Sequence, residues 1–277
     1  MVSPYPTKAV EVMNRKMTVV DVGEGEVVVL GHSYLWDAEM WRPQIEALSR
    51  SYRVIVPNLW GHGTSDDLPP GTGDMRDLGR HHLMLLDSLG IDRFALAGLS
   101  IGGMWGMEIA CLAPERVTAL ALLDTSAGPE PELSREQYLG MFRIVEAAGR
   151  IPDEMIEAIV PLYFAPATLT AAPALPAILR AGLKTVSTRR LLDTIVPLGH
   201  ILFGRRDLRP DLAHLRMPSL VMTGSEDIPR PVREGREIAE ILRCQFIELP
   251  GAGHISALEV PDLVSTHLAD FLHKALG

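Results

Sequence analysis

The sequence predicts an α/β fold in which helices cover both faces of a mostly parallel central sheet. Short apolar runs that are typical of buried strands alternate with longer segments of helical periodicity over residues 1–126, and this alternation resumes at residue 217. Strands of a parallel sheet are buried on both faces and therefore appear as continuous apolar runs, such as VVVLG at 27–31. With 277 residues, the chain is long enough to form one large core that carries an insertion.

The elements of this core follow one another in a regular order. The expected strands lie at 17–23, 26–32, 52–60, 93–100, 116–126, 217–227 and 244–251. The expected helices lie at 38–51, 74–90, 101–115, 231–243 and about 256–276. Gly90 ends the second of these helices, in the position that a helix C-terminus favours.

The middle of the chain has a different character. Ser134 and Gln137 have capping-box spacing at the start of a helical segment, 134–150. Helical pieces separated by prolines follow, without strand alternation. The sequence therefore predicts a helical cap or lid at 127–213, inserted into a core made of 1–126 and 214–277.

Composition limits the possible partners and the cellular compartment. The formal net charge is −9 and no run of Lys or Arg occurs, which argues against nucleic acid or an anionic membrane as a partner. The apolar runs are far shorter than the roughly 20 residues of a membrane span, and residues 1–13 lack the apolar region of a signal peptide. Two cysteines form no disulfide framework, so we expect a cytoplasmic protein; the oligomeric state is not indicated.

The segment Gly98-Leu99-Ser100-Ile101-Gly102 fits the pattern G-x-S-x-G between a strand and a helix. A sharp strand-to-helix turn at this point strains the serine backbone, and the flanking glycines prevent collisions around it. The Ile101 N–H would then point from the first helical turn at a bound carbonyl oxygen. Ser100 is therefore the candidate nucleophile, which needs an adjacent base because a serine hydroxyl is a weak nucleophile at neutral pH.

A base and an acid follow later in the chain. His254 lies in a loop of small residues between the last strand and the last helix. Asp227 lies just beyond a strand, where a carboxylate could fix the tautomer of His254 and stabilise the imidazolium. Glu226 and Asp124 are the alternative acids.

A second oxyanion donor is expected in the loop after the strand at 26–32, which reads His32-Ser33-Tyr34-Leu35-Trp36. The backbone N–H of Tyr34 is the candidate. Ser33 must have an ordinary backbone conformation, because a side chain restricts φ and ψ more than glycine does.

Five features in order make the chain resemble the α/β-hydrolase fold superfamily along nearly its whole length. They are the His32 loop, GHGTS at 61–65, GLSIGG at 98–103, GSED at 224–227 and AGHISALEVPD at 252–262. The chain order Ser, Asp, His also matches this superfamily. Within it, the sequence is most similar to small bacterial esterases, cofactor-free haloperoxidase-like perhydrolases and 3-oxoadipate enol-lactonases. Most esterases have His-Gly where this chain has His32-Ser33.

The resemblance implies a serine hydrolase that acts on a small to medium, fairly apolar ester or lactone through an acyl-enzyme on Ser100, with no cofactor. The alternatives are an enol-lactonase-like enzyme, a carbon–carbon bond hydrolase or perhydrolase, and a slow-turnover small-molecule receptor. GHGTSDD does not provide the H-x-H-x-D-H cluster of metal-dependent lactonases, so no metal is expected. The candidate pocket residues are His32, Trp36, Trp60, Met141 and Phe164. We expect the pairs Arg189-Arg190 and Arg205-Arg206 on the surface.

Overall fold

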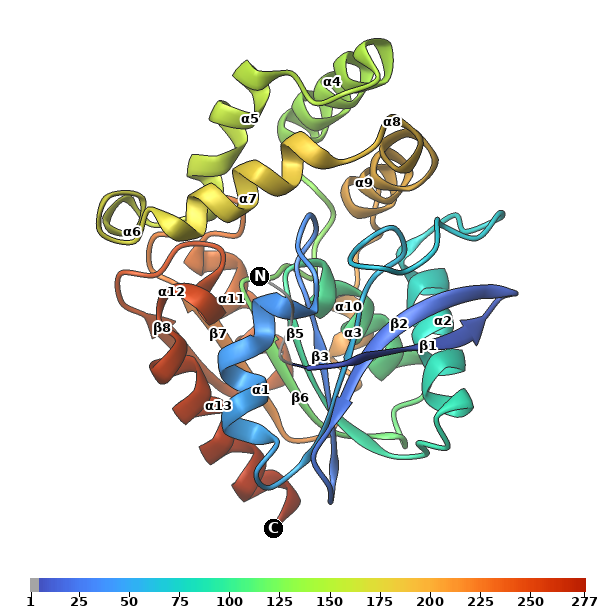
Figure 1. The fold of residues 1–277 in the computed structure, drawn as a ribbon. Helices are drawn as coiled ribbons and strands as arrows, with labels where there is room; N and C mark the ends of the chain where they lie inside the picture. The colour runs from blue at the N-terminus through green and yellow to red at the C-terminus, as the bar shows by residue number, and fades with distance from the viewer. Residues whose placement is uncertain (1–4) are drawn as a thin grey trace.

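The computed structural model describes residues 5–277, and its centre is an eight-stranded sheet within these residues. The strand order is β1-β2-β4-β3-β5-β6-β7-β8 (Figure 1). The bounds are Thr7–Val12 (β1), Arg15–Val22 (β2), Val27–Gly31 (β3), Arg53–Pro57 (β4), Phe94–Leu99 (β5), Val117–Leu123 (β6), Ser219–Gly224 (β7) and Gln245–Leu249 (β8). All neighbours from β4 to β8 are parallel, whereas β1 pairs antiparallel with β2 and β2 antiparallel with β4. The prediction of a mostly parallel sheet is confirmed.

Strand β1 was not predicted, because its sequence TKAVEV contains no continuous apolar run and most of its residues are exposed. It lies at the edge of the sheet and is joined to β2 by a tight turn at Met13 and Asn14, which both have positive φ angles. Two consecutive residues with positive φ are the signature of a type I′ hairpin turn, although the pair Met-Asn is unusual for it.

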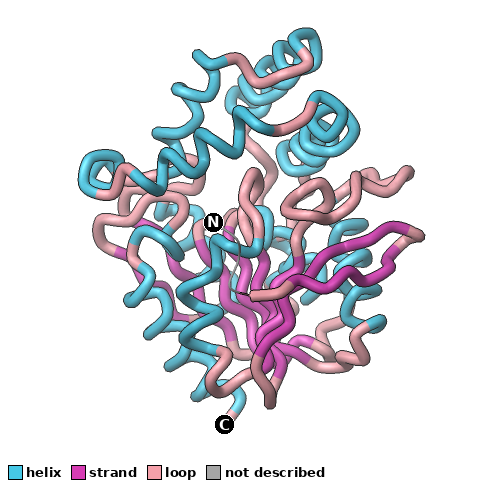
Figure 2. The backbone as a smooth tube through the Cα atoms, in the orientation of Figure 1, coloured by secondary structure: helices cyan, strands magenta, loops and turns pink. Residues whose placement is uncertain are grey.

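Helices cover both faces of the sheet (Figure 2). On one face lie α1 (Arg42–Leu48) and α13 (Pro261–Leu276); on the other lie α2 (Met75–Ser88), α3 (Ile101–Leu112) and α11 (Val232–Leu242). Side chains alternate along the strands, so Val28 packs with the first group and Val29 with the second. The segment expected as one helix at 38–51 begins as a 3₁₀ turn, η1 (Ala38–Trp41), because Pro43 lies in the first turn of α1.

The segment between β6 and β7 contains only helical elements and connecting turns. We call α4–α9, with η2 and η3, the upper helices; they lie over the end of the sheet at which β5 and β6 finish (Figure 1). They are α4 (Glu132–Ala148), α5 (Asp153–Ile159), η2 (Val160–Tyr163), α6 (Pro166–Ala171), α7 (Ala174–Thr185), α8 (Thr188–Arg190), η3 (Leu191–Ile195) and α9 (Val196–Phe203). The short α10 (Arg209–Leu212) leads back to the sheet, and α12 (Ser256–Glu259) precedes α13.

Proline positions explain how this segment is divided. Pro161, Pro166 and Pro197 each lie in the first turn of a helical element. Pro166 follows the non-helical residue Ala165, so its missing N–H has no cost. The predicted capping box at Ser134 is wrong, since α4 begins two residues earlier, behind Pro131, and has Glu132 in its first turn.

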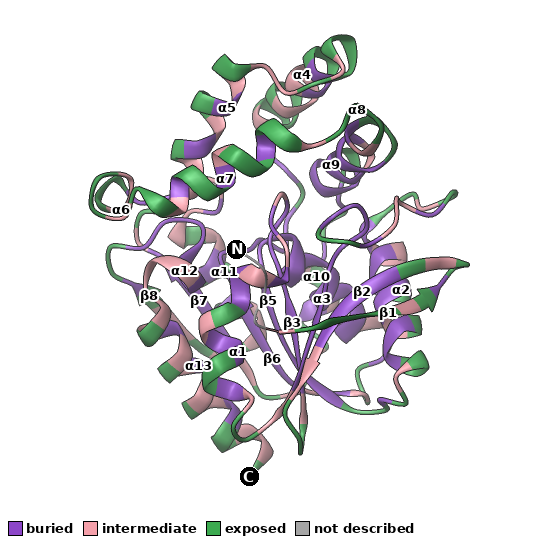
Figure 3. Ribbon diagram, viewed as in Figure 1, coloured by how far each residue is buried: buried purple, intermediate pink, exposed green. Residues whose placement is uncertain are grey.

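The sheet is more deeply buried than the upper helices (Figure 3). Strands β5 and β6 are almost entirely buried, whereas α4 buries Phe142 and Val145 and α6 buries no residue. In the described part of the chain, no helix has both the length and the apolar character that crossing a membrane requires.

Candidate active site

Ser100 lies on the sharp turn between β5 and α3, with φ 58° and ψ −119°. Its carbonyl oxygen accepts a hydrogen bond from Thr125 Oγ1 at 2.7 Å, and its N–H donates to Leu123 O at 3.0 Å. A Cβ on Gly98 would lie 2.4 Å from the Gly102 carbonyl, and one on Gly102 would lie 2.1 Å from Gly31 O. These glycines let α3 start against the sheet, and the tightly packed turn holds Ser100 in a backbone conformation that costs about 1–3 kcal/mol.

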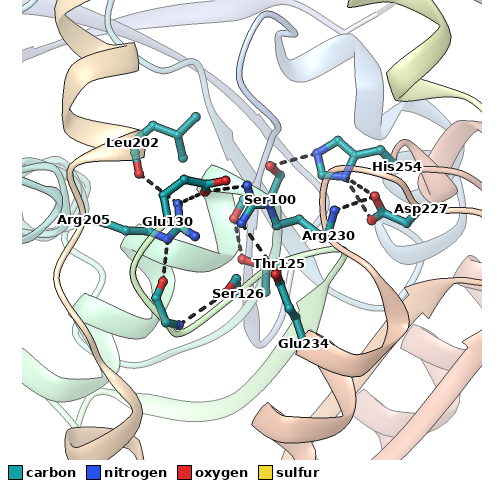
Figure 4. A network of polar contacts seen from close by, with 11 residues as sticks. Ser100, Thr125, Ser126, Glu130, Leu202, Arg205, Asp227, Arg230, Glu234 and His254 are labelled. Carbon is teal, nitrogen blue, oxygen red and sulfur yellow. Dashed lines mark hydrogen bonds and ion pairs between the residues drawn. The ribbon is translucent and has the colours of Figure 1, made fainter. Parts of the chain in front are cut away.

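Ser100, His254 and Asp227 meet in one chain of hydrogen bonds (Figure 4). Nε2 of His254 lies 3.0 Å from Ser100 Oγ, and Nδ1 lies 3.0 and 3.1 Å from the two carboxylate oxygens of Asp227. All three side chains are buried. The Asp227 carboxylate therefore fixes the tautomer that leaves Nε2 free to accept the serine proton.

The structure separates the three candidate acids. Glu226 is exposed and its side chain has no hydrogen bond to residues 5–277. Asp124 is buried and accepts hydrogen bonds from Gly224 N at 2.8 Å and from Ser256 Oγ at 2.5 Å, not from His254. Burial, and then the charge of nearby Asp227, raise the pKa of Asp124 well above its usual range. Asp124 thus joins the end of β6 to the loops that carry Asp227 and His254.

The two backbone N–H groups expected to hold an oxyanion belong to Tyr34 and Ile101, near Ser100. Tyr34 and Ser100 both line the same cavity, and Ile101 follows Ser100 directly. Within residues 5–277, neither the Tyr34 N–H nor the Ile101 N–H donates a hydrogen bond. Ser33 has an ordinary backbone conformation, as predicted, and the residue of this loop with a positive φ is Leu35, at 68°.

Two buried histidines hold the loop that carries Tyr34. His62 Nε2 accepts from Leu35 N at 3.1 Å while its Nδ1–H donates to Trp60 O. His32 Nε2 accepts from Leu59 N at 2.9 Å while its Nδ1–H donates to Ser33 O. Burial is the largest cause that lowers the pKa of His62 to about 3 and that of His32 to about 4, so both are neutral at pH 7. Each ring can therefore accept one backbone hydrogen bond and donate another.

The cavity above Ser100 has a volume of about 100 Å³ and is mainly apolar. Its apolar lining comes largely from the upper helices and includes Met141, Phe142, Met155, Leu162, Ile195 and Phe203. Met141 was predicted there. The other four pocket candidates do not line it, so those predictions are wrong: His32, Trp36, Trp60 and Phe164.

Each of these four side chains has a packing role instead. His32 supports the loop beneath Tyr34. Trp60 is fully buried and donates from Nε1 to His81 Nδ1 at 3.1 Å. Trp36 and Phe164 pack edge to face against each other, with ring centroids 6.2 Å apart.

Sequence analysis missed three polar residues that line the cavity, Tyr138, Tyr163 and Arg230. Arg230 lies three residues after Asp227, and its backbone N–H donates to Asp227 Oδ1 at 2.9 Å. The only available signal was this short spacing to the candidate acid.

Arg230 belongs to a buried ionic cluster with Glu130 and Arg205 (Figure 4). Glu130 Oε2 accepts from Arg230 Nη2 at 2.6 Å and from Arg205 Nη1 at 2.7 Å. The surface prediction for Arg205 is therefore wrong, because Glu130 compensates its charge inside the protein. Arg189 is exposed, as expected.

Tyr34 also contacts the upper helices. Its hydroxyl donates to Ile195 O at 2.6 Å, and its carbonyl accepts from the Tyr163 hydroxyl at 3.4 Å. Ile195 ends η3, which is a single π-helix turn, a form found frequently at functional sites.

Among the described residues, no cluster of three or more His, Cys, Asp or Glu could hold a metal ion.

Comparison with known proteins agrees with this geometry. A family model described as the alpha/beta hydrolase fold matches residues 26–157. The chain is 33% identical over 273 residues to the dihydrolipoyllysine-residue acetyltransferase component of the acetoin cleaving system of Pseudomonas putida, and the match covers 98% of this chain and 70% of that protein.

Two solved structures are similar along nearly the whole chain. A thermophilic esterase from Thermogutta terrifontis has a TM-score of 0.87 and 26% identity, over 97% of this chain and 99% of its own. The enol-lactonase from Burkholderia xenovorans LB400 has a TM-score of 0.85 and 28% identity, over 96% and 100%.

Proposed function

The chain belongs to the α/β-hydrolase fold superfamily, and from that premise we propose that it hydrolyses carboxylic esters or lactones through an acyl-enzyme on Ser100. The observation that carries this proposal is the continuous hydrogen-bonded series from Asp227 through His254 to Ser100, at the base of an apolar cavity. The similar solved structures named as an esterase and an enol-lactonase support this class of substrate.

In the first step, His254 Nε2 takes the proton of Ser100 Oγ as this oxygen attacks the substrate carbonyl carbon. The carbonyl electrons move to its oxygen, which accepts hydrogen bonds from the backbone N–H groups of Ile101 and Tyr34. Asp227 stabilises the imidazolium that forms. When the tetrahedral intermediate collapses, the bond to the leaving alkoxide oxygen breaks, and this oxygen takes the proton from Nε2.

In the second step, His254 takes a proton from water, and the resulting hydroxide attacks the acyl carbon on Ser100. The same two N–H groups hold the second oxyanion. Collapse breaks the ester bond to Oγ, which recovers its proton from Nε2, and the carboxylic acid leaves. In a lactone, the acid and the alcohol remain parts of one molecule.

The cavity supports a short, mostly apolar substrate. An apolar cavity of about 150 Å³ can hold benzene, and the cavity above Ser100 has about 100 Å³. The upper helices supply most of its walls, so we propose that residues 127–213 act as a lid on the core formed by 1–126 and 214–277.

The direct test is Ser100→Ala, measured on p-nitrophenyl butyrate and on covalent labelling by a fluorophosphonate. Turnover should fall by at least 10³-fold and labelling should disappear, because the attacking oxygen is gone. Ser126→Ala is the matched control: this serine is also buried, and its variant should keep the label. A Ser100→Ala protein that is still labelled would exclude Ser100 as the nucleophile.

The time course tests the receptor alternative in the same experiment. An efficient hydrolase gives a constant rate over many turnovers. A burst of about one equivalent of p-nitrophenol followed by arrest would indicate a slow-turnover receptor instead.

A further inference from the structure

Arg230 and Tyr138 both line the cavity above Ser100, and each has a hydrogen-bond donor that the acyl-enzyme mechanism does not use. Nη1 and Nη2 of Arg230 donate to Glu234 and Glu130, but the Nε–H donates to no group in residues 5–277. The Tyr138 hydroxyl likewise has no hydrogen-bond partner in the described chain, although its residue lines the same cavity. Since most other lining groups are apolar, these donors form a distinct polar part of the wall.

Both donors are fixed in place. Arg230 is held at 2.6 Å by Glu130, which also binds Arg205, and its side chain is only 4% exposed. The ring of Tyr138 stacks on Phe203, with centroids 3.8 Å apart and planes 10° from parallel. Burial raises the pKa of the Tyr138 phenol, which is therefore a neutral donor at pH 7. Fixed donors favour binding because little conformational entropy is lost when a partner arrives.

The surrounding charges indicate which kind of acceptor fits. Arg205 and Arg230 are positive, while Glu130, Glu234 and the nearby Asp227 are carboxylates, so the formal charges leave one net negative charge. A second carboxylate on the substrate would add to this excess. An uncharged carbonyl oxygen accepts the same hydrogen bonds without that repulsion.

We propose that the Nε–H of Arg230 and the hydroxyl of Tyr138 form a subsite for a second, uncharged carbonyl oxygen on the ester or lactone. This subsite selects oxo-substituted substrates over plain alkyl ones. The inference rests on the proposed function, because the reacting carbonyl must lie at Ser100 for the second oxygen to reach the subsite.

The test compares kcat/KM for matched ester pairs. On the acyl side these are p-nitrophenyl 4-oxopentanoate and p-nitrophenyl pentanoate; on the alcohol side they are 2-oxopropyl butyrate and propyl butyrate. The native protein should prefer the oxo ester of at least one pair by about tenfold, the effect of one or two hydrogen bonds. Equal rates within both pairs would overturn the subsite.

Two variants assign the preference to its donors. Tyr138→Phe removes only the hydroxyl. Arg230→Lys keeps the positive charge that pairs with Glu130 but loses the planar Nε–H. Each should lower the preference for the oxo ester at least threefold, mainly by lowering kcat/KM for that ester. Tyr52→Phe, a partly buried tyrosine outside the cavity, should leave the preference unchanged. A preference that survives in both cavity variants would contradict the assignment.

A further substrate and the labelling assay separate the remaining outcomes. A preference for the p-nitrophenyl monoester of succinic acid over both pentanoate esters would overturn the proposal that the subsite binds an uncharged carbonyl oxygen. If p-nitrophenyl pentanoate is hydrolysed and Ser100 is labelled, but no oxo preference exists, the subsite fails and the proposed function stands. If neither hydrolysis nor labelling occurs, the proposed function itself fails.

Discussion

The edge of the sheet that carries Ser100 and the upper helices above it contribute to the same cavity but are built in different ways. Ser100, Asp227 and His254 each lie in a loop directly after a strand, so the sheet itself determines where they stand. The upper helices are tied to this edge by long-range contacts, such as Tyr34 to Ile195 and Thr168 to Glu259. The proposed reacting groups therefore come from the sheet edge, and most of the residues that line the cavity come from the upper helices.

This difference suggests how the two parts respond to change. At the sheet edge, neighbouring loops share hydrogen bonds and tight backbone contacts. The structure around a substituted residue can therefore adjust very little. In the upper helices, many side chains are exposed and therefore have fewer neighbours to disturb. We expect substitutions at the edge to affect catalysis or folding strongly, and equivalent ones in the upper helices to be tolerated.

The largest effect is expected at the acid that holds His254. Asp227→Asn should lower kcat by about 10³–10⁴-fold, because an amide that donates to Nδ1 favours the wrong imidazole tautomer. The measurement is the steady-state hydrolysis of p-nitrophenyl butyrate at pH 7.5, with circular dichroism to confirm the fold.

Asp124→Asn is the matched change at the second buried acid. Asp124 contacts Gly224 and Ser256 but not His254, so kcat should fall less than about tenfold while the melting temperature decreases. If Asp124→Asn lost activity as severely as Asp227→Asn, the proposed division between a catalytic acid and a loop-joining acid would be wrong.

Much of the sheet edge could be predicted from the sequence because its signals are local. The turn around Ser100 requires glycines at 98 and 102, and these are visible as a pattern of five residues. Chain order then places Asp227 and His254 after later strands, at the same edge. The exception is Leu35, whose positive φ has no sequence signal, because leucine rarely has this conformation.

The cavity could not be predicted in the same way, because its lining depends on how separate helices pack. An aromatic residue near a motif can face the cavity or the core, and Trp36 and Trp60 both pack away from the cavity. The ionic cluster joins Glu130, Arg205 and Arg230 across up to 100 residues of sequence. No local pattern reports such a pairing, so the polar part of the cavity was missed.

A glycine-to-alanine pair tests the contrast in packing. A Cβ on Gly102 would lie 2.1 Å from the backbone oxygen of Gly31, which cannot move without disturbing β3. Gly102→Ala should therefore lower the free energy of unfolding by about 3 kcal/mol. Urea unfolding followed by circular dichroism measures this change.

Gly182→Ala is the counterpart in the upper helices. Gly182 lies within α7, and no atom lies within 4 Å of a Cβ added there. Alanine should stabilise the helix by about 0.5–1 kcal/mol because it restricts the unfolded chain and favours helix. Equal destabilisation by both substitutions would contradict the difference between the two parts.

The last prediction concerns a contact at which the two parts meet. Tyr34→Phe keeps the backbone N–H proposed to hold the oxyanion but removes the hydrogen bond from the side chain to Ile195 O. The loop should then hold that N–H less accurately. We expect kcat to fall about fivefold to tenfold with little change in KM, since the N–H acts mainly in the transition state.

Thr194→Val distinguishes this positioning role from a general loss of stability. Thr194 Oγ1 accepts from Leu68 N at 2.9 Å and so ties the same π turn to a core loop that carries no proposed oxyanion donor. Both variants should lose about 1 kcal/mol of unfolding free energy, the usual value of one buried hydrogen bond. Only Tyr34→Phe should slow labelling by the fluorophosphonate, because only its loop bears the N–H that we propose holds the developing negative charge. If Thr194→Val slowed labelling equally, the π turn would act on the site through overall lid closure, and the direct coupling through Tyr34 would be refuted.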